Sequence, residues 1–342
     1  MKETPKCRVF GECGGCKYQD IPYSEELKIK EAQIRSLFEE RGWSGDLLEP
    51  ITASPRPYHY RNRLDMSLRR FKDGRVCVGF NLPGSFSVLE ITECPIAMEA
   101  ISGFLPRLKE EACAKLPPDY RTANLTVKTG DDGRVIWGGI GRRSLRTAEA
   151  DYLWTEVDGL RIHYAMDTFF QANSSILPAL KRTLERWSEC GEGGLLLDLY
   201  SGVGLFGFLL AARFRRVAMI EENPAAATVA RFNRERTGLG NVIVSDGRVE
   251  EVLPSLLTDA ETSHATALVD PPRRGLSPQA LENVIREKRI GSLLYLSCHP
   301  ESLVRDLEVL TGAGFEILRG AGFDFFPKTK HIETLVWLRR KS

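Results

Sequence analysis

Hydrophobic residues in the second half of the chain fall into short apolar runs separated by segments with a helical pattern. Apolar runs of the kind that form buried strands occur at 195–199, 216–220, 241–245, 267–269 and 292–297. Segments with a helical pattern lie at 174–188 and 224–237. Strands that alternate with helices predict a parallel, doubly wound sheet, so we expect an α/β, Rossmann-like domain over residues 169–342.

The middle of the chain has shorter strands and frequent turn signals. Runs with β character occur at 63–68, 76–80, 87–91, 125–129 and 135–139. Turns such as Lys72-Asp73-Gly74 separate them, and one helix is predicted at 96–108. These features predict a smaller, β-rich central domain over residues 45–168.

Residues 1–44 form a third stretch with its own character. Its first half is rich in cysteine and glycine and has little hydrophobic periodicity. Ile34, Leu37 and Phe38 then contribute to one apolar stripe among charged residues, which predicts a helix at 25–41. We therefore expect an N-terminal cysteine-rich segment followed by a helix.

Composition limits the class of protein. With 42% hydrophobic and 27% charged residues over 342 positions, the chain has enough apolar material for packed cores. Its longest apolar run, 205–212, is too short to cross a bilayer, and its first residues lack the apolar segment of a secretion signal. We therefore expect a cytoplasmic protein without membrane contacts. A net charge of +1 does not favour a generic polyanion binder, although local basic patches can still bind RNA.

Eight cysteines in a reducing compartment point to metal binding or catalysis before disulfides. Cys7, Cys13 and Cys16 supply three closely spaced thiols beside glycines, and Cys94 is the best candidate for a fourth ligand. Four such thiolates hold either an iron–sulfur cluster or a zinc ion. The spacing alone leaves both metals open.

A glycine-rich turn follows the first predicted strand of the α/β domain. Gly202, Gly204 and Gly207 have the spacing of a dinucleotide-binding fingerprint, and glycines let a backbone approach a ligand closely. Glu221, at the end of the next strand, is placed to accept hydrogen bonds from ribose hydroxyls. Asp198 favours S-adenosylmethionine over NAD, because a carboxylate attracts a cationic amino-acid group and repels a pyrophosphate.

Two further polar segments follow predicted strands and are expected at the same edge of the sheet. One begins at Asp270 and contains paired prolines, and the other contains Cys298. A free cysteine is most often a small buried side chain, and Glu333, at the start of a predicted strand 334–338, is by itself an ordinary strand carboxylate. The residues alone therefore leave catalytic and structural interpretations open.

Cations alternate with aromatic side chains in segment 56–63. Cations neutralise phosphates and aromatic rings stack on unpaired bases, so this segment is a candidate RNA contact. Solvated arginines at a sheet edge are the alternative interpretation. Further arginines that extend the candidate surface are Arg69, Arg70, Arg142 and Arg143.

Four segments together resemble the signature of RNA 5-methyluridine (uracil-C5) methyltransferases. They are Phe169-Phe170-Gln171-Ala172-Asn173, Asp270-Pro271-Pro272-Arg273-Arg274-Gly275, Ser297-Cys298-His299-Pro300 and the stretch from Phe326 to Glu333. All four occur in the order found in that family, and the resemblance covers nearly the whole chain.

The resemblance implies methylation of carbon-5 of a uridine in RNA, with S-adenosylmethionine as methyl donor. Cys298 would be the nucleophile that attacks carbon-6, and Glu333 the base that removes the carbon-5 proton. The residues that match cofactor-binding positions of the family are Gln171, Tyr200, Glu221 and Asp270. Asp270 would also lie close to the target base, which must be unpaired or flipped out to enter the site.

The cysteine element resembles that of the ribosomal-RNA branch of the family, which binds a [4Fe–4S] cluster through it. The resemblance therefore implies an iron–sulfur cluster on the four ligands Cys7, Cys13, Cys16 and Cys94. It makes 23S ribosomal RNA the expected substrate and transfer RNA the alternative. We also expect a monomer without the N-terminal RNA-binding β-barrel, or TRAM domain, of some members.

Two positions depart from the family pattern. His299 follows the candidate nucleophile where asparagine is usual, and Leu205 stands where several members carry an asparagine that contacts the cofactor. Two functions of other classes stay as alternatives. One is an iron–sulfur oxidoreductase that uses NAD, and the other is a non-catalytic RNA-binding module held together by zinc.

Overall fold

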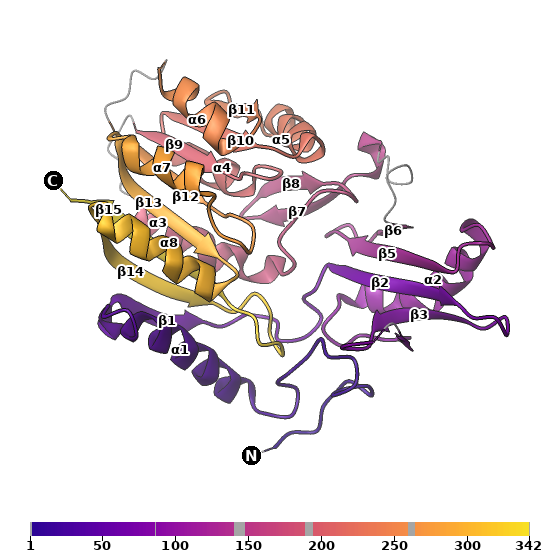
Figure 1. Ribbon diagram of the computed structural model, residues 1–342. Helices are drawn as coiled ribbons and strands as arrows, with labels where there is room; N and C mark the ends of the chain where they lie inside the picture. Colours follow the sequence, from indigo (N-terminus) through magenta and orange to yellow (C-terminus); the bar gives the residue numbers. More distant parts are fainter. Residues whose placement is uncertain (1, 86, 140–147, 189–193, 259–263, 342) are drawn as a thin grey trace.

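The computed structural model describes residues 2–85, 87–139, 148–188, 194–258 and 264–341, and it has two lobes (Figure 1). In this part of the chain, eight strands form the sheet of the larger lobe. Their spatial order is β1 (Leu48–Thr52), β14 (Phe315–Phe323), β15 (Glu333–Arg340), β13 (Ile290–Ser297), β12 (Ala265–Val269), β9 (Leu195–Leu199), β10 (Arg216–Glu221) and β11 (Val242–Asp246). From β13 to β11 all neighbours are parallel, whereas β15 is antiparallel to both β13 and β14. The predicted α/β sheet is confirmed.

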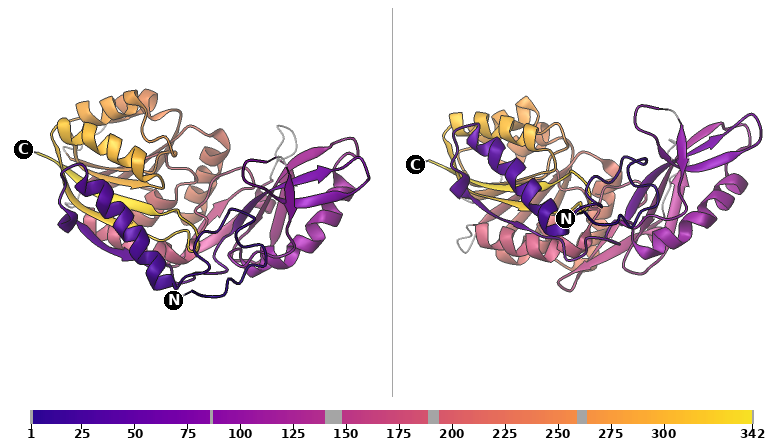
Figure 2. Two further views of the ribbon diagram at one scale, coloured as in Figure 1. Left: turned by 60° about the horizontal axis from the view of Figure 1, so that its bottom comes forward. Right: turned by 90° about the horizontal axis from the view of Figure 1, so that it is seen from below.

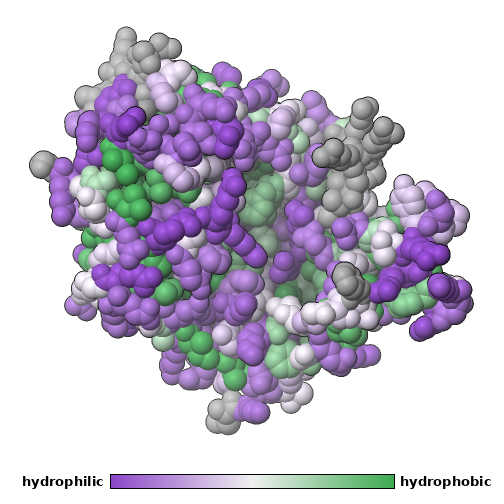
Figure 3. All heavy atoms as spheres, viewed as in Figure 1, coloured by the Kyte–Doolittle hydropathy of each residue, from purple (hydrophilic) through white to green (hydrophobic). Residues whose placement is uncertain are grey.

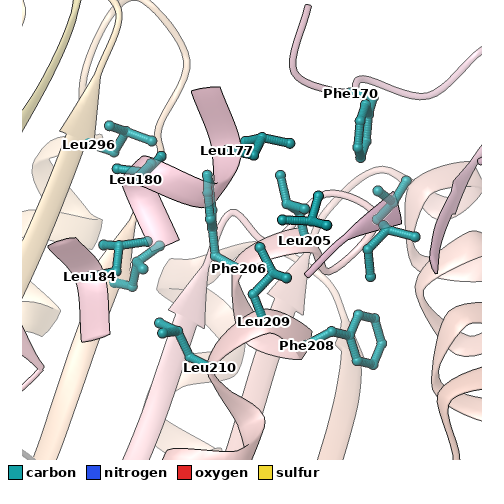
Figure 4. Packing of buried hydrophobic residues seen from close by; sticks show 14 of the residues in the cluster. Phe170, Leu177, Leu180, Leu184, Leu205, Phe206, Phe208, Leu209, Leu210 and Leu296 are labelled. Atoms are coloured by element: carbon teal, nitrogen blue, oxygen red, sulfur yellow. The ribbon is translucent and has the colours of Figure 1, made fainter. Parts of the chain in front are cut away.

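Helices cover both faces of this sheet, which explains why its central strands are apolar throughout. All five residues of β9 are buried, as expected for a parallel strand covered on two sides. One face carries α3 (Leu177–Trp187), α4 (Leu205–Leu210) and α5 (Pro224–Thr237). Figure 4 shows Leu177 and Leu180 of α3 facing Phe206 and Leu209 of α4 in this core.

The opposite face carries the N-terminal helix together with three helices of the second half. These are α1 (Tyr23–Glu39), α6 (Val249–Thr258), α7 (Pro278–Arg286) and α8 (Pro300–Gly312). Ile34 and Phe38 of α1 belong to the core on this face. The predicted helix 25–41 is confirmed, and it begins two residues earlier than expected.

Strand β1 also belongs to this sheet, because it pairs in parallel with β14 at its edge. Gly320 of β14 lets the two elements approach, since a Cβ there would lie 2.7 Å from Leu48 Cδ2. The N-terminal region is thus built into the large lobe. The limits 1–44, 45–168 and 169–342 stay predictions of domain organisation.

The smaller lobe is an antiparallel sheet with one helix, α2 (Glu99–Lys115), packed on it (Figure 1). Its strands in spatial order are β4 (Val88–Glu90), β3 (Val76–Asn81), β2 (Arg63–Arg70), β5 (Thr122–Thr129) and β6 (Val135–Gly139). Alternate residues of β2, such as Leu64 and Leu68, point into a core that also contains Leu108 of α2. The predicted β-rich domain is confirmed.

A hairpin of β7 (Leu153–Val157) and β8 (Leu160–Tyr164) connects the lobes and packs on α5. The N-terminal segment runs between the lobes in both views of Figure 2. The space-filling view shows a hollow between the two lobes (Figure 3). Among the described residues, no helix combines the length and the apolar character needed to cross a membrane.

Candidate active site

Every predicted site residue of the large lobe lies at one edge of its sheet. Parallel strands end at the same edge, so the loops after β9, β10, β12 and β13 meet there. Strand β15 runs the other way and begins at that edge with Glu333. In the antiparallel pair, Ser297 lies opposite Thr334, which makes Cys298 and Glu333 neighbours. Residues 35 positions apart are thereby brought together by strand register.

The loop after β9 is a tight backbone cradle. Tyr200, Gly202 and Gly204 all have positive φ angles, and a Cβ on Gly204 would lie 2.4 Å from the Phe208 ring. Around Gly202, by contrast, the space that a Cβ would occupy is empty to 4 Å. The N–H of Gly207 donates to Asp198 Oδ2 at 2.8 Å, which closes the loop on the strand.

Several buried polar atoms around this cradle lack a hydrogen-bond partner among the described residues. They are Asp198 Oδ1, Ser201 Oγ and Gln171 Oε1. Buried polar atoms are nearly always satisfied in folded proteins, so these atoms indicate a site for a polar ligand. Beyond them, Tyr200 lines a pocket with side chains that include Glu222 and Arg248. The donor and acceptor set fits S-adenosylmethionine.

Glu221 organises the same cradle from the end of β10. Its carboxylate accepts hydrogen bonds from the backbone N–H groups of Gly202 and Asn223, both at 2.7 Å. Burial raises its pKa. The second oxygen lone pairs remain available toward a ligand in the loop.

Asp270 and Gln171 come together from opposite sides of the site. Gln171 Nε2 donates to Asp270 Oδ2 at 3.1 Å, and the Gln171 carbonyl accepts from Asn62 Nδ2 of the smaller lobe at 2.9 Å. Burial, and to a lesser extent the nearby Asp198, raises the pKa of Asp270 to about 7. The structure thus joins the motif at 169–173 to the motif at 270–275.

The Cys298 thiol faces two carboxyl groups and one guanidinium. Burial raises its pKa to about 11, and Glu333 and Asp270 add to that rise. Arg273 opposes it by hydrogen bonding to the sulfur. Glu333 is only 4% exposed, its Oε2 has no partner in the described part of the chain, and burial raises its pKa well above the usual range.

Arg273 is a site residue that the sequence did not single out. It lies in the proline-rich segment after β12 and lowers the pKa of both Cys298 and Glu333. Its signal was the position directly after the paired prolines, which fix the loop beside the sheet edge.

The N-terminal cysteines lie in a turn-rich loop beside the smaller lobe. The pKa of Cys16 is raised to about 12, first by burial and then by Cys94, Cys13 and Cys7, so the four thiols approach one another. Gln19 hydrogen bonds to Cys16, and its Oε1 accepts from the Cys7 N–H at 3.0 Å. Among the described residues, however, no group of three or more His, Cys, Asp or Glu side chains is arranged to hold a metal ion.

The family model described as "tRNA (Uracil-5-)-methyltransferase" matches residues 148–341, which is more than half of the chain. This chain belongs to that family of RNA uracil-C5 methyltransferases. It is accordingly an enzyme that uses S-adenosylmethionine to methylate carbon-5 of uracil in RNA. The family and the class of reaction expected from the four motifs are confirmed.

Known proteins similar to this uracil-C5 methyltransferase match it along nearly its whole length. An uncharacterised RNA methyltransferase of Clostridium tetani is 29% identical over 397 aligned positions, covering 100% of this chain and 85% of the relative. The 23S rRNA (uracil(1939)-C(5))-methyltransferase RlmD of Salmonella choleraesuis is 27% identical, covering 99% and 82%.

One solved structure is similar in sequence and fold. The tRNA (uracil-54, C5)-methyltransferase of Pyrococcus abyssi, in complex with S-adenosyl-L-homocysteine, superposes with a TM-score of 0.76. It is 25% identical to this chain, with coverage of 95% of this chain and 85% of that one. The Rossmann-like methyltransferase sheet and the β-rich N-terminal lobe are therefore features of the family fold.

The candidate RNA segment 56–63 is only partly available on the surface of this methyltransferase. Tyr60 is 2% exposed and donates its hydroxyl to the Pro327 carbonyl at 2.9 Å, so it cannot stack on RNA. Arg63 is engaged by Asp65 in a two-pronged ion pair. Arg56 and His59 are exposed and keep the predicted role.

Of the additional arginines, Arg70 donates to the carbonyls of Cys113 and Leu116 within the smaller lobe. Arg69 lies over the Phe71 ring. Arg142 and Arg143 lie outside the described residues.

The two departures from the family pattern have structural explanations. His299 is the N-cap of α8, where its Nδ1 accepts the N–H of Ser302 at 3.3 Å. An imidazole thereby supplies the acceptor that an asparagine side chain provides at other helix N-termini. Leu205 is 5% exposed and belongs to the core beneath α4, so it packs instead of contacting a ligand.

Proposed function

We propose that this enzyme methylates a specific uridine of 23S ribosomal RNA through a covalent adduct between Cys298 and carbon-6 of the uracil. The observation that carries the chemistry is the strand register that makes Cys298 and Glu333 neighbours beside the glycine cradle. A nucleophile and a base on one target must lie within reach of the same ring.

In the proposed reaction, the Cys298 thiolate forms a bond to carbon-6, and the electron pair of the carbon-5–carbon-6 double bond moves toward the carbonyl at carbon-4. Carbon-5 becomes nucleophilic and takes the methyl group, which S-adenosylmethionine supplies with loss of neutral S-adenosylhomocysteine. Glu333 then accepts the proton from carbon-5, the double bond re-forms, and the thiolate leaves. Uridine is converted to 5-methyluridine, and one proton is released.

We assign the cofactor cradle to Gln171, Tyr200, Glu221 and Asp270. Its support is the set of buried, unpartnered oxygens at Asp198, Ser201 and Gln171, which a polar ligand would satisfy. The hydrogen bond from Gln171 to Asp270 supports a second role at the target base, because it links the cradle to Cys298. Arg273 stabilises the thiolate.

The target uridine enters the hollow between the lobes as an unpaired or flipped base. Phe169 supports this assignment, since its ring is 62% exposed directly beside Gln171 and can stack on a base. Arg56 and His59 provide contacts to the RNA backbone.

An iron–sulfur cluster on Cys7, Cys13, Cys16 and Cys94 is part of the proposal. The support is chemical, because four thiols approach one another and the Gln19 Nε2 is buried without a partner among the described residues. An amide N–H of this kind can donate to a cluster thiolate. Zinc is the alternative, and purified protein with a broad visible absorbance and stoichiometric iron would exclude it.

Ribosomal RNA is proposed because the cysteine element resembles that of the ribosomal branch and the Salmonella relative acts on 23S rRNA. Transfer RNA is the second candidate, favoured by the Pyrococcus structure. Mass-spectrometric mapping of both RNAs from a strain that lacks the gene separates them. Loss of 5-methyluridine from transfer RNA alone would overturn the ribosomal assignment.

The assigned roles predict opposite behaviour of two variants on RNA that contains 5-fluorouridine. Because fluorine at carbon-5 cannot leave as a proton, the wild-type adduct should persist on denaturing gels. Cys298→Ala should form no adduct, whereas Glu333→Gln should form one and should also trap ordinary uridine RNA, with turnover reduced by about 10²-fold or more. An adduct formed by Cys298→Ala would contradict the nucleophile assignment.

A further inference from the structure

The loop from Asp324 to His331 leads directly to Glu333, and its backbone is held by residues far away in the sequence. The N–H of Lys328 donates to Glu26 Oε1 at 2.6 Å. The Lys328 carbonyl accepts from the N–H groups of Lys17 at 2.7 Å and Tyr18 at 3.0 Å. Figure 2 shows this yellow loop beside the indigo N-terminal segment.

Lys328 is an unusual residue for this position. Its φ angle is 67°, in the left-handed region that side chains other than glycine rarely adopt, and it is 2% exposed. Its Nζ lies 3.4 Å from the Ile21 carbonyl and 3.5 Å from Glu26 Oε2. A strained, buried lysine persists only where its surroundings determine it, which directs attention to what it holds in place.

The surroundings form a charge-balanced cluster. Lys30 Nζ lies 2.8 Å from Glu26 Oε1 and 2.7 Å from Asp324 Oδ1, and it also donates to the Phe326 carbonyl at 3.1 Å. Two ammonium groups therefore meet two carboxylates, all nearly inaccessible to solvent. Removing one charge leaves an uncompensated partner, so the geometry of the loop depends on each member.

Glu333 itself is not fixed by its side chain. Its Oε2 makes no hydrogen bond to any described residue, so the carboxylate is aimed by the backbone from which it projects. That backbone continues the clamped loop, in which Thr329 Oγ1 accepts the N–H of His331 at 3.2 Å. The position of the base is thus set two residues upstream.

We propose that Lys328 is a positioning residue for the deprotonation step, through which residues 17–30 set the place of the Glu333 carboxylate. The proposal rests on the proposed role of Glu333 as base. Lys17 and Tyr18 directly follow Cys16, so the clamp also connects the cysteine loop to the catalytic loop through two backbone hydrogen bonds. The N-terminal segment thereby acts on one step of the reaction while contacting none of the reacting atoms.

The test uses Lys328→Met in the full-length protein, with Lys330→Met as a matched control because Lys330 is an exposed lysine of the same loop. Single turnovers are followed on in vitro transcribed 23S RNA made with uridine or with 5-fluorouridine. Lys328→Met should form the adduct at a rate near that of wild type but resolve it at least about tenfold more slowly on uridine RNA. Lys330→Met should resolve the adduct like wild type.

Three further readouts separate positioning from folding. Lys328→Arg should restore most of the resolution rate, and KM for S-adenosylmethionine should be unchanged in both Lys328 variants. If Lys328→Met does not fold, Tyr60→Phe replaces it, because it removes only the hydroxyl that holds the Pro327 carbonyl. Tyr60→Phe should slow resolution in the same direction by a smaller factor.

Equal losses in adduct formation and resolution, or wild-type resolution in both Lys328→Met and Tyr60→Phe, would overturn the positioning role. Failure of the wild-type enzyme to form an adduct with 5-fluorouridine RNA, when it methylates uridine RNA, would instead overturn the proposed mechanism. The two failures are therefore distinguishable in one series of gels.

Discussion

Cys298 combines a position suited to nucleophilic attack with an environment that suppresses its ionisation. Burial and two neighbouring carboxyls raise its thiol pKa to about 11, and Arg273 acts in the opposite direction. The thiolate is the nucleophilic form, so the fraction that can attack is small near neutral pH. Arg273 is the positively charged neighbour that increases this fraction.

Removal of that guanidinium should slow the first covalent step. Below the thiol pKa, the thiolate fraction rises tenfold per pH unit, so adduct formation on 5-fluorouridine RNA should accelerate with pH between about 7 and 9. Arg273→Met raises the thiol pKa further and should reduce the rate about three- to tenfold at fixed pH. Stopped reactions on denaturing gels measure this rate, and a pH-independent rate in both proteins would contradict the account.

His299 is predicted to matter for helix stability. Its Nδ1 accepts the Ser302 N–H at the start of α8, so His299→Ala should lower the free energy of unfolding by about 1 kcal/mol. His299→Asn should restore it, because asparagine is a good N-cap. Urea unfolding measures both, and equal stability of all three proteins would exclude the capping role.

At the scale of elements, the glycine loop after β9 is the feature most sensitive to a single added atom. A Cβ on Gly207 would lie 2.3 Å from Met219 Cε and 2.9 Å from Asp198 Oδ2. Gly207→Ala should therefore displace Asp198 and weaken S-adenosylmethionine binding by about tenfold or more. Gly240→Ala is the control, since nothing lies within 4 Å of its Cβ. Calorimetric titration with S-adenosylhomocysteine measures both affinities.

Element prediction succeeded where local pattern and tertiary burial agreed. The strand 195–199 and the helix 224–237 have the bounds expected, because both are strongly patterned and end in clear signals such as Gly238. The β7–β8 hairpin was missed although Asp158 and Gly159, with φ angles of 49° and 82°, carry the Asp-Gly turn signal. Strand β1 was also missed, since its pairing with β14 is a long-range contact.

At the scale of the whole molecule, the ligand-free site should make stability depend on pH. Burial raises the pKa values of Asp198 and Asp270 to about 7 and that of Glu333 well above normal. A folded-state pKa above the unfolded value stabilises the protein at low pH, and this contribution is lost as pH rises through the folded-state value. These groups should therefore lower stability between about pH 4 and pH 7.

Asp270→Asn removes one of these groups and should flatten that dependence. The melting temperature of wild type should fall relative to that of the variant as pH rises from about 5 to 8, because only wild type must ionise a buried carboxyl there. Differential scanning fluorimetry of both ligand-free proteins measures the difference. Parallel curves would show that Asp270 ionises without penalty.

The sequence by itself determined the fold class, the family and the motifs, because apolar runs, glycine spacing and short signatures are local properties of a chain. Only the tertiary structure decided which of these residues meet. Strand register brought Cys298 to Glu333, and side-chain burial withdrew Tyr60 from the candidate RNA surface. The clamp on Lys328 joins residues about 300 positions apart, and such contacts leave no local pattern because they are fixed by packing.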